Sequence, residues 1–64
     1  MRLRVNGGDV ELPEPTLAEA VATVTDARRG IAVAVNGEVI PKAQWTRPLS
    51  EGDSVEILTA TQGG

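Results

Sequence analysis

Polar and apolar residues alternate strictly over residues 1–5, where Met1, Leu3 and Val5 form the apolar face. This period of two predicts a β-strand with one face against a core. Residues 6–9 read Asn-Gly-Gly-Asp, and an Asn-Gly pair tolerates the positive φ angles of a tight hairpin turn, so residues 10–12 are predicted to return as the antiparallel partner. A phosphate-binding loop at these glycines is the alternative, but the Lys-Ser/Thr pair and the glycine spacing of a P-loop are missing.

A helix is predicted to begin at Thr16, because Thr16 and Glu19 have the spacing of a capping box. Apolar residues recur after it at helical spacing, in one stripe that must lie on a sheet: Leu17, Ala20, Val21 and Val24. Residues 26–30 are expected to end this helix, with Arg28 and Arg29 near its C-terminus, where cations interact favourably with the helix dipole. A partner-binding patch is the alternative for these two arginines.

The next apolar segment, residues 31–35, is apolar at every position, which favours an interior strand or one that faces a partner. Asn36-Gly37 predicts a second hairpin turn that leads into residues 38–40. Pro41 is expected to end that strand.

Trp45, the only aromatic residue, lies in a segment expected to be irregular, residues 42–48, and is interpreted as a lid on the core rather than a platform for ligand stacking. Residues 51–53 read Glu-Gly-Asp, a polar turn whose carboxylates would act as an acid/base pair only inside a cleft. Residues 54–59 alternate again and predict a last strand with Val55 and Ile57 facing inward.

Two hairpins, one helix and a returning strand predict an α+β fold, a mixed sheet of four to five strands with one helix packed on one face, as in a ubiquitin-like β-grasp. The strand phases place Ala32, Ala34, Glu56 and Leu58 on the face away from the helix. Leu58 then has no core to enter. We predict that this face binds a partner, because the small Ala32 and Ala34 permit close approach; an exposed leucine without a role is the alternative.

The composition limits the function. The 64 residues suffice for one small domain and include no cysteine and no histidine, so the commonest metal ligands, the usual general base and the thiol nucleophile are missing. We therefore expect no metal site and no independent enzyme. The net charge of -3 disfavours nucleic-acid binding, and no apolar run has the length of a membrane span or a signal-peptide core. We expect a cytoplasmic protein that binds neither nucleic acid nor a membrane.

The chain ends Gln62-Gly63-Gly64, and glycine has no Cβ, so such an end can lie extended in a channel too narrow for side chains. We predict a β-grasp domain over residues 1–59 and a flexible tail over residues 60–64. The functional atom is then the α-carboxylate of Gly64, with Gly63 and Gln62 recognised beside it. A frayed terminus without a function is the alternative.

Several of these segments resemble the thiamin-pathway sulfur carriers of the ThiS family. Residues 31–38 read Ile-Ala-Val-Ala-Val-Asn-Gly-Glu, residues 52–58 read Gly-Asp-Ser-Val-Glu-Ile-Leu, and residues 62–64 read Gln-Gly-Gly. Val-Asn-Gly at residues 5–7 and Trp45 add to the resemblance, which extends over essentially the whole chain.

The resemblance implies a fold in which the first and last strands pair in parallel at the centre of the sheet, and a carrier that binds no cofactor itself. A ThiF-like adenylyltransferase would use ATP and Mg to adenylate the Gly64 carboxylate. Sulfur from a cysteine desulfurase or another persulfide donor would convert it into a thiocarboxylate, which a ThiG-like thiazole synthase would accept. The small subunit of molybdopterin synthase, a non-covalent β-grasp binding module and a protein modifier joined to lysines are the alternatives.

Overall fold

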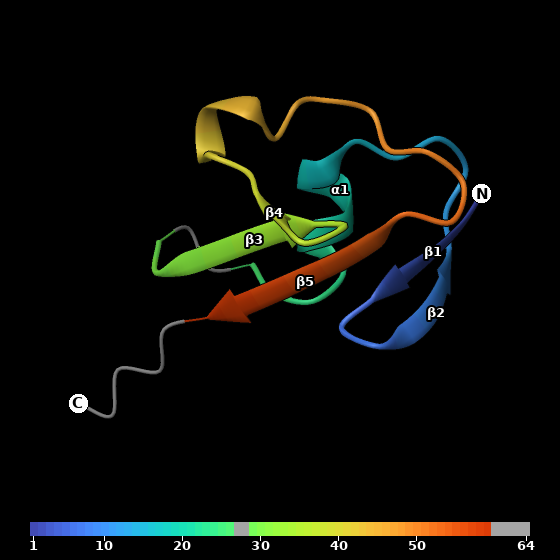
Figure 1. The fold of residues 1–64 in the computed structure, drawn as a ribbon, viewed down its shortest axis with the longest axis horizontal. Helices are drawn as coiled ribbons and strands as arrows, with labels where there is room; N and C mark the ends of the chain where they lie inside the picture. The colour runs from blue at the N-terminus through green and yellow to red at the C-terminus, as the bar shows by residue number, and fades with distance from the viewer. Residues whose placement is uncertain (27–28, 60–64) are drawn as a thin grey trace.

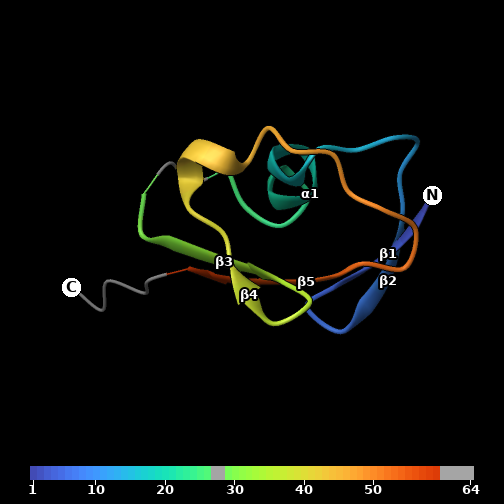
Figure 2. The same cartoon turned by 45° about the horizontal axis from the view of Figure 1, so that its top comes forward.

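The computed structural model describes residues 1–26 and 29–59, which form one twisted sheet with a helix packed across one face (Figures 1 and 2). The elements are β1 (Arg2–Val5), β2 (Gly8–Glu11), α1 (Leu17–Ala22), β3 (Ile31–Val35), β4 (Glu38–Val39), the 3₁₀ helix η1 (Lys42–Gln44) and β5 (Ser54–Thr59). The strand order is β2-β1-β5-β3-β4, with β5 parallel to β1 and antiparallel to β3. The predicted β-grasp is confirmed, including the parallel pair at the centre.

Both hairpins turn through two residues. Asn6 and Gly7 have φ angles of 51° and 82°, and Asn36 and Gly37 have 52° and 86°, which is the left-handed pair of a type I′ turn. Because the first turn needs only two residues, β2 begins at Gly8, opposite Val5, and not at residue 10 as predicted. The P-loop alternative is wrong, since Gly7 and Gly8 are a turn residue and a paired strand residue.

The asparagine of each turn also holds the central strand. Asn6 Oδ1 accepts a hydrogen bond from the Ile57 amide at 2.7 Å. On the other side of β5, Asn36 Oδ1 accepts one from the Ser54 amide at 3.0 Å. The two turns therefore fix β5 from both of its edges, by side-chain bonds that the turn propensity of asparagine alone does not predict.

The start of α1 follows the prediction and its end does not. Thr16 Oγ1 accepts from the Glu19 amide, and Glu19 Oε1 accepts from the Thr16 amide at 2.8 Å, a complete capping box. The helix ends at Ala22, so the expectation of a helix that continues through Val24 to the arginines is wrong. Residues 21–25 contain four β-branched residues, which lower helix propensity, and the Thr23 hydroxyl competes by donating to the Ala20 carbonyl at 2.7 Å.

Of the two arginines that follow this segment, the structure describes Arg29. Arg29 is exposed and lies in a bend rather than at a helix end. Residues 27 and 28 lie outside the described residues, so the hypothesis of an Arg28-Arg29 binding patch stays untested. Val24, which the stripe placed in the core, is 45% exposed.

The core lies between α1 and the sheet. Its buried side chains are Leu3, Val5, Leu17, Ala20, Val21, Val33, Val35, Ile40, Trp45, Leu49, Val55 and Ile57. Trp45 is 9% exposed, and its indole N–H donates to the Ile40 carbonyl at 3.1 Å, which confirms the lid interpretation and leaves no ring face for a ligand. None of the helices in the described residues is long and apolar enough to cross a membrane.

The bond from Ile57 to Asn6 predicts a stability effect. Asn6→Gly keeps the positive φ of the turn but removes the acceptor, so it should lower the free energy of unfolding by about 1 kcal/mol. Urea denaturation measures the change. Asn6→Asp retains an acceptor oxygen and is the matched control; a loss of stability as large in Asn6→Asp as in Asn6→Gly would contradict this role for the side-chain oxygen.

Candidate functional site

The predicted functional end of the chain lies outside the described residues. These are Gln62, Gly63 and Gly64, together with the rest of the proposed tail over residues 60–64. The structure describes the strand that precedes them as far as Thr59. The structure therefore places the end of β5 and the surface around it.

The sheet face opposite α1 carries an exposed apolar patch formed by Ala32, Ala34, Val39 and Leu58. Leu58 is 70% exposed, and Ala32 lies directly across from it on β3. Ala34 lies across from Glu56 on one side and from Val39 on the other. These side chains line a shallow depression with Leu58 and Val39 at its rims. The structure thus brings the predicted partner-binding residues together on one face: Ala32, Ala34, Glu56 and Leu58.

Val39 is the member of this patch that the sequence analysis missed. It is 73% exposed. The sequence contains the necessary signal: a two-residue turn at Asn36-Gly37 pairs Ala34 with Val39, and cross-strand partners share a face. Val39 was predicted only as a strand residue, without a face assigned to it.

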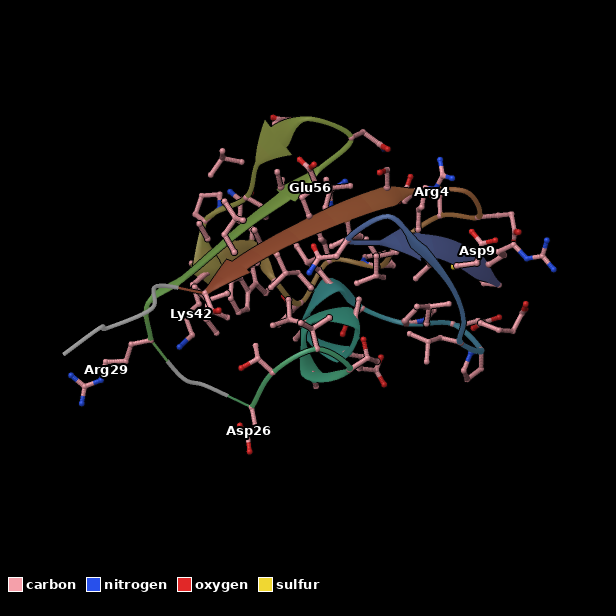
Figure 3. All side chains as sticks on the ribbon, turned by 90° about the horizontal axis from the view of Figure 1, so that it is seen from below. Arg4, Asp9, Asp26, Arg29, Lys42 and Glu56 are labelled. Carbon is pink, nitrogen blue, oxygen red and sulfur yellow. The ribbon has the colours of Figure 1, made fainter. Side chains whose placement is uncertain are left out.

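Charge is distributed unevenly over the same face. Arg4 and Glu56 both lie on the side of the sheet away from α1 (Figure 3). Toward the β2 edge Arg4 is opposite Asp9, and Arg2 approaches Glu11 with an Nε to Oε1 distance of 3.9 Å. The Arg2–Glu11 pair is exposed and contributes little to stability. Within the described residues, Glu56 is the acidic group that borders the apolar patch.

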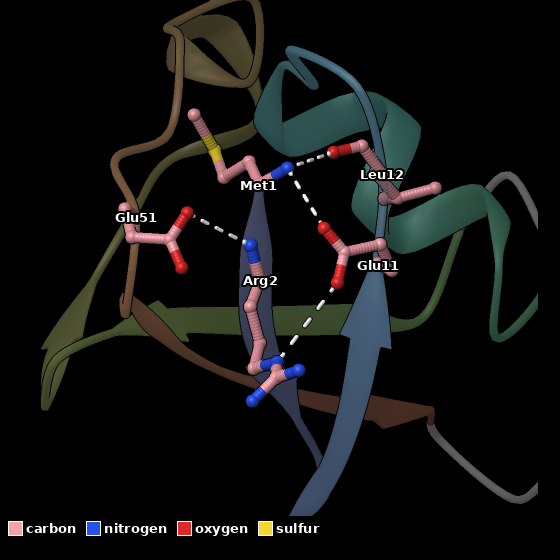
Figure 4. Close-up of polar contacts among 5 residues, drawn as sticks. All are labelled: Met1, Arg2, Glu11, Leu12 and Glu51. Atoms are coloured by element: carbon pink, nitrogen blue, oxygen red, sulfur yellow. Dashed lines mark hydrogen bonds and ion pairs between the residues drawn. The ribbon is translucent and has the colours of Figure 1, made fainter.

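The carboxylates of residues 51–53 are used to hold the backbone. Glu51 Oε1 accepts from the Arg2 amide at 3.0 Å, beside the contacts of the Met1 ammonium with Glu11 and Leu12 (Figure 4). Asp53 accepts from the Ser50 amide at 2.8 Å and from the Asn36 side chain at 3.0 Å. These bonds close a turn and connect it to β1 and to the second hairpin. They give both carboxylates a structural role in place of the acid/base chemistry weighed above.

The family assignment rests on a match to nearly the whole chain. A model of the ThiS family matches residues 3–64. The chain belongs to the ThiS family. Among solved structures, it is similar to the crystal structure of the thiamine biosynthesis protein ThiS from Geobacter metallireducens, with 28% sequence identity, 100% of both chains covered and a TM-score of 0.76. A comparison with curated protein sequences gave no significant match.

The two faces of β5 should respond differently to substitution. Ile57→Ala removes a buried side chain and should lower the free energy of unfolding by about 2–5 kcal/mol. Leu58→Glu changes an exposed side chain and should alter it by about 0.5 kcal/mol or less. Thermal or urea denaturation of the two variants decides the matter. Equal destabilisation would show that Leu58 belongs to the core and that the face assignment is wrong.

Proposed function

We propose that this chain is a sulfur carrier of thiamin biosynthesis and that the α-carboxylate of Gly64 carries the sulfur. The observation that supports this most directly is the ThiS family match, because it extends over residues 3–64 and so includes the final glycines. The similarity over the full length of the Geobacter metallireducens thiamine biosynthesis protein supports the same pathway. It also favours this function over the molybdopterin synthase subunit and over a non-covalent binding module.

The chemistry begins at a carboxylate, which is a poor electrophile. In the proposed sequence, a ThiF-like adenylyltransferase joins the Gly64 carboxylate to AMP from Mg-ATP, with pyrophosphate as the other product. The terminal sulfur of a persulfide then attacks the carbonyl carbon and expels AMP. Cleavage of the resulting S–S bond by a thiol leaves the thiocarboxylate, whose sulfur is transferred to the thiazole precursor on a ThiG-like thiazole synthase.

This division of labour makes the chain a carrier and the partners the catalysts. Sulfur held at a terminal carbonyl requires no side-chain thiol, which agrees with a sequence that contains no cysteine. The ATP and Mg belong to the adenylyltransferase. What this chain contributes is a surface for the partner and a narrow end, where two glycines present backbone alone.

The apolar patch is the surface we assign to the adenylyltransferase. Leu58 belongs to the last strand before the tail, so an enzyme that binds there also directs Gly64 toward its active site. Covering Leu58 contributes roughly 1.5–3 kcal/mol to binding. The small Ala32 and Ala34 admit a protruding side chain of the partner between Leu58 and Val39. Glu56 beside them favours a basic group in that partner.

The carboxylate assignment predicts a strict dependence on chain length. Deletion of Gly64, or addition of one alanine after it, should abolish adenylation and leave the fold unchanged, because each change moves the carboxylate away from the partner's reacting groups. Incubation with the adenylyltransferase, ATP and a persulfide source, followed by intact-mass measurement, shows whether one oxygen has been replaced by sulfur. Normal conversion of the extended chain would contradict the proposal.

The patch assignment predicts that Leu58→Glu weakens binding to the adenylyltransferase by about 10- to 100-fold, the equivalent of losing the burial of one leucine. Val24→Glu is the matched control, because Val24 is also an exposed apolar residue but lies in the turn that follows α1. Titration calorimetry measures both affinities. Equal affinities for Leu58→Glu and the unchanged chain would exclude the patch as the docking surface.

A further inference from the structure

The edge of β5 that faces β1 is paired along only part of its length. β1 lies beside β5 at Arg4, opposite Ser54, and at Val5, opposite Val55. On the other edge, β3 accompanies β5 as far as Thr59. In Figure 1 the arrowhead of β5 accordingly extends well past the hairpin formed by β1 and β2. Among the described residues, the last residues of β5 thus have a strand on one side only.

Asn6 ends the ladder between β1 and β5. Its amide donates to the Val55 carbonyl at 2.9 Å, and its side-chain Oδ1 accepts from the Ile57 amide at 2.7 Å. A residue of a parallel strand bonds in this way through its own N–H and C=O. At Asn6 the chain has already turned, with φ at 51°, and the side-chain carbonyl replaces the backbone carbonyl. The ladder therefore continues to the Ile57 N–H and stops there.

The alternation of hydrogen bonds shows which groups come next on this edge. The Asn36 amide donates to the Ser54 carbonyl at 2.7 Å, so even-numbered residues of β5 direct their backbone groups toward β3. Leu58, opposite Ala32, belongs to this set. The odd-numbered residues direct theirs toward the β1 edge, as the bonds of Val55 and Ile57 with Asn6 show.

The next two groups on that edge are the Ile57 carbonyl and the Thr59 amide. Within the described residues, no strand lies beside them, and Thr59 is exposed. They have the donor and acceptor spacing that Asn6 satisfies one step earlier. An extended segment placed here would extend the sheet along the C-terminal half of β5. Its backbone groups would form the hydrogen bonds, so no particular side chains would be needed.

We propose that the enzyme that adenylates Gly64 adds an extended backbone segment to this edge of β5, pairing with the Ile57 carbonyl and the Thr59 amide. The proposal rests on the carrier function above. Leu58 lies between these two groups, so an enzyme that covers Leu58 also excludes water from them. Backbone groups that lose water must find partners. The enzyme that docks on the apolar patch is thus the occupant that must satisfy this edge.

Replacing residue 59 tests the proposal. Thr59→Pro removes the amide hydrogen, and proline is tolerated at a strand edge where, among the described residues, that hydrogen has no strand to pair with. Thr59→Ala keeps the amide and is the matched control. Thr59→Pro should bind the adenylyltransferase about tenfold more weakly, the equivalent of one lost hydrogen bond, while Thr59→Ala binds like the unchanged chain. Equal affinities of the two variants would overturn the proposal.

Amide hydrogen exchange gives a second test that does not require a variant to fold. The Leu58 amide should be protected with and without the adenylyltransferase, because Leu58 is paired with Ala32 on β3. The Thr59 amide should become protected only in the complex. Absence of protection in the complex would overturn the proposal, and so would protection that appears on concentrating the free chain, which would assign the edge to a second copy.

The two proposals fail in different ways. If the mass experiment shows no replacement of oxygen by sulfur in the unchanged chain, the carrier function is wrong. If sulfur is incorporated while Thr59 shows neither the proline effect nor the exchange effect, the carrier function stands and the edge pairing is wrong.

Discussion

The parallel pairing of β1 with β5 is the constraint on which the rest of the structure depends. The two strands come from opposite ends of the chain, so their pairing closes a loop that contains α1, β3 and β4. The buried residues of β5, Val55 and Ile57, reach the core only if this strand has the correct register, since a shift by one residue would exchange Ile57 and Leu58 between the faces. The bonds from Asn6 and Asn36 oppose such a shift, because each connects a fixed turn to one particular amide of β5.

Local sequence signals predicted the elements well where they agree with the tertiary structure. The two Asn-Gly turns, the capping box at Thr16 and the alternation along β5 each specify a geometry within a few residues, and each is confirmed. The end of α1 was predicted wrongly, because an apolar spacing that includes Val24 was given more weight than the β-branched residues around it. The second role of Asn6 was not predictable in this way, since its partner lies 51 residues away.

The part of the candidate site that was predictable from the sequence is the part that depends only on which face of its strand each residue occupies. Strand periodicity placed Ala32, Ala34, Glu56 and Leu58 on the outer face, and the structure brings them together there. Val39 required the pairing between neighbouring strands, which periodicity within one strand does not contain. The open backbone edge at Thr59 could not be predicted from strand periodicity or from the pairing within one hairpin. It depends on where β1 ends relative to β5, a relation between residues that are distant in the sequence.

The placement of Trp45 has a practical consequence for observing this protein. Trp45 is the only aromatic residue and therefore the only intrinsic fluorophore, and it packs on the helix side of the sheet with its indole N–H bonded to the Ile40 carbonyl. The apolar patch lies on the other side, with the full thickness of the sheet between them. The fluorescence of Trp45 therefore reports whether the core is folded. Binding on the outer face does not change the surroundings of its indole ring. Under the proposed function, loading of Gly64 or docking on the outer face would leave the Trp45 environment unchanged, so an added label is needed to follow either event.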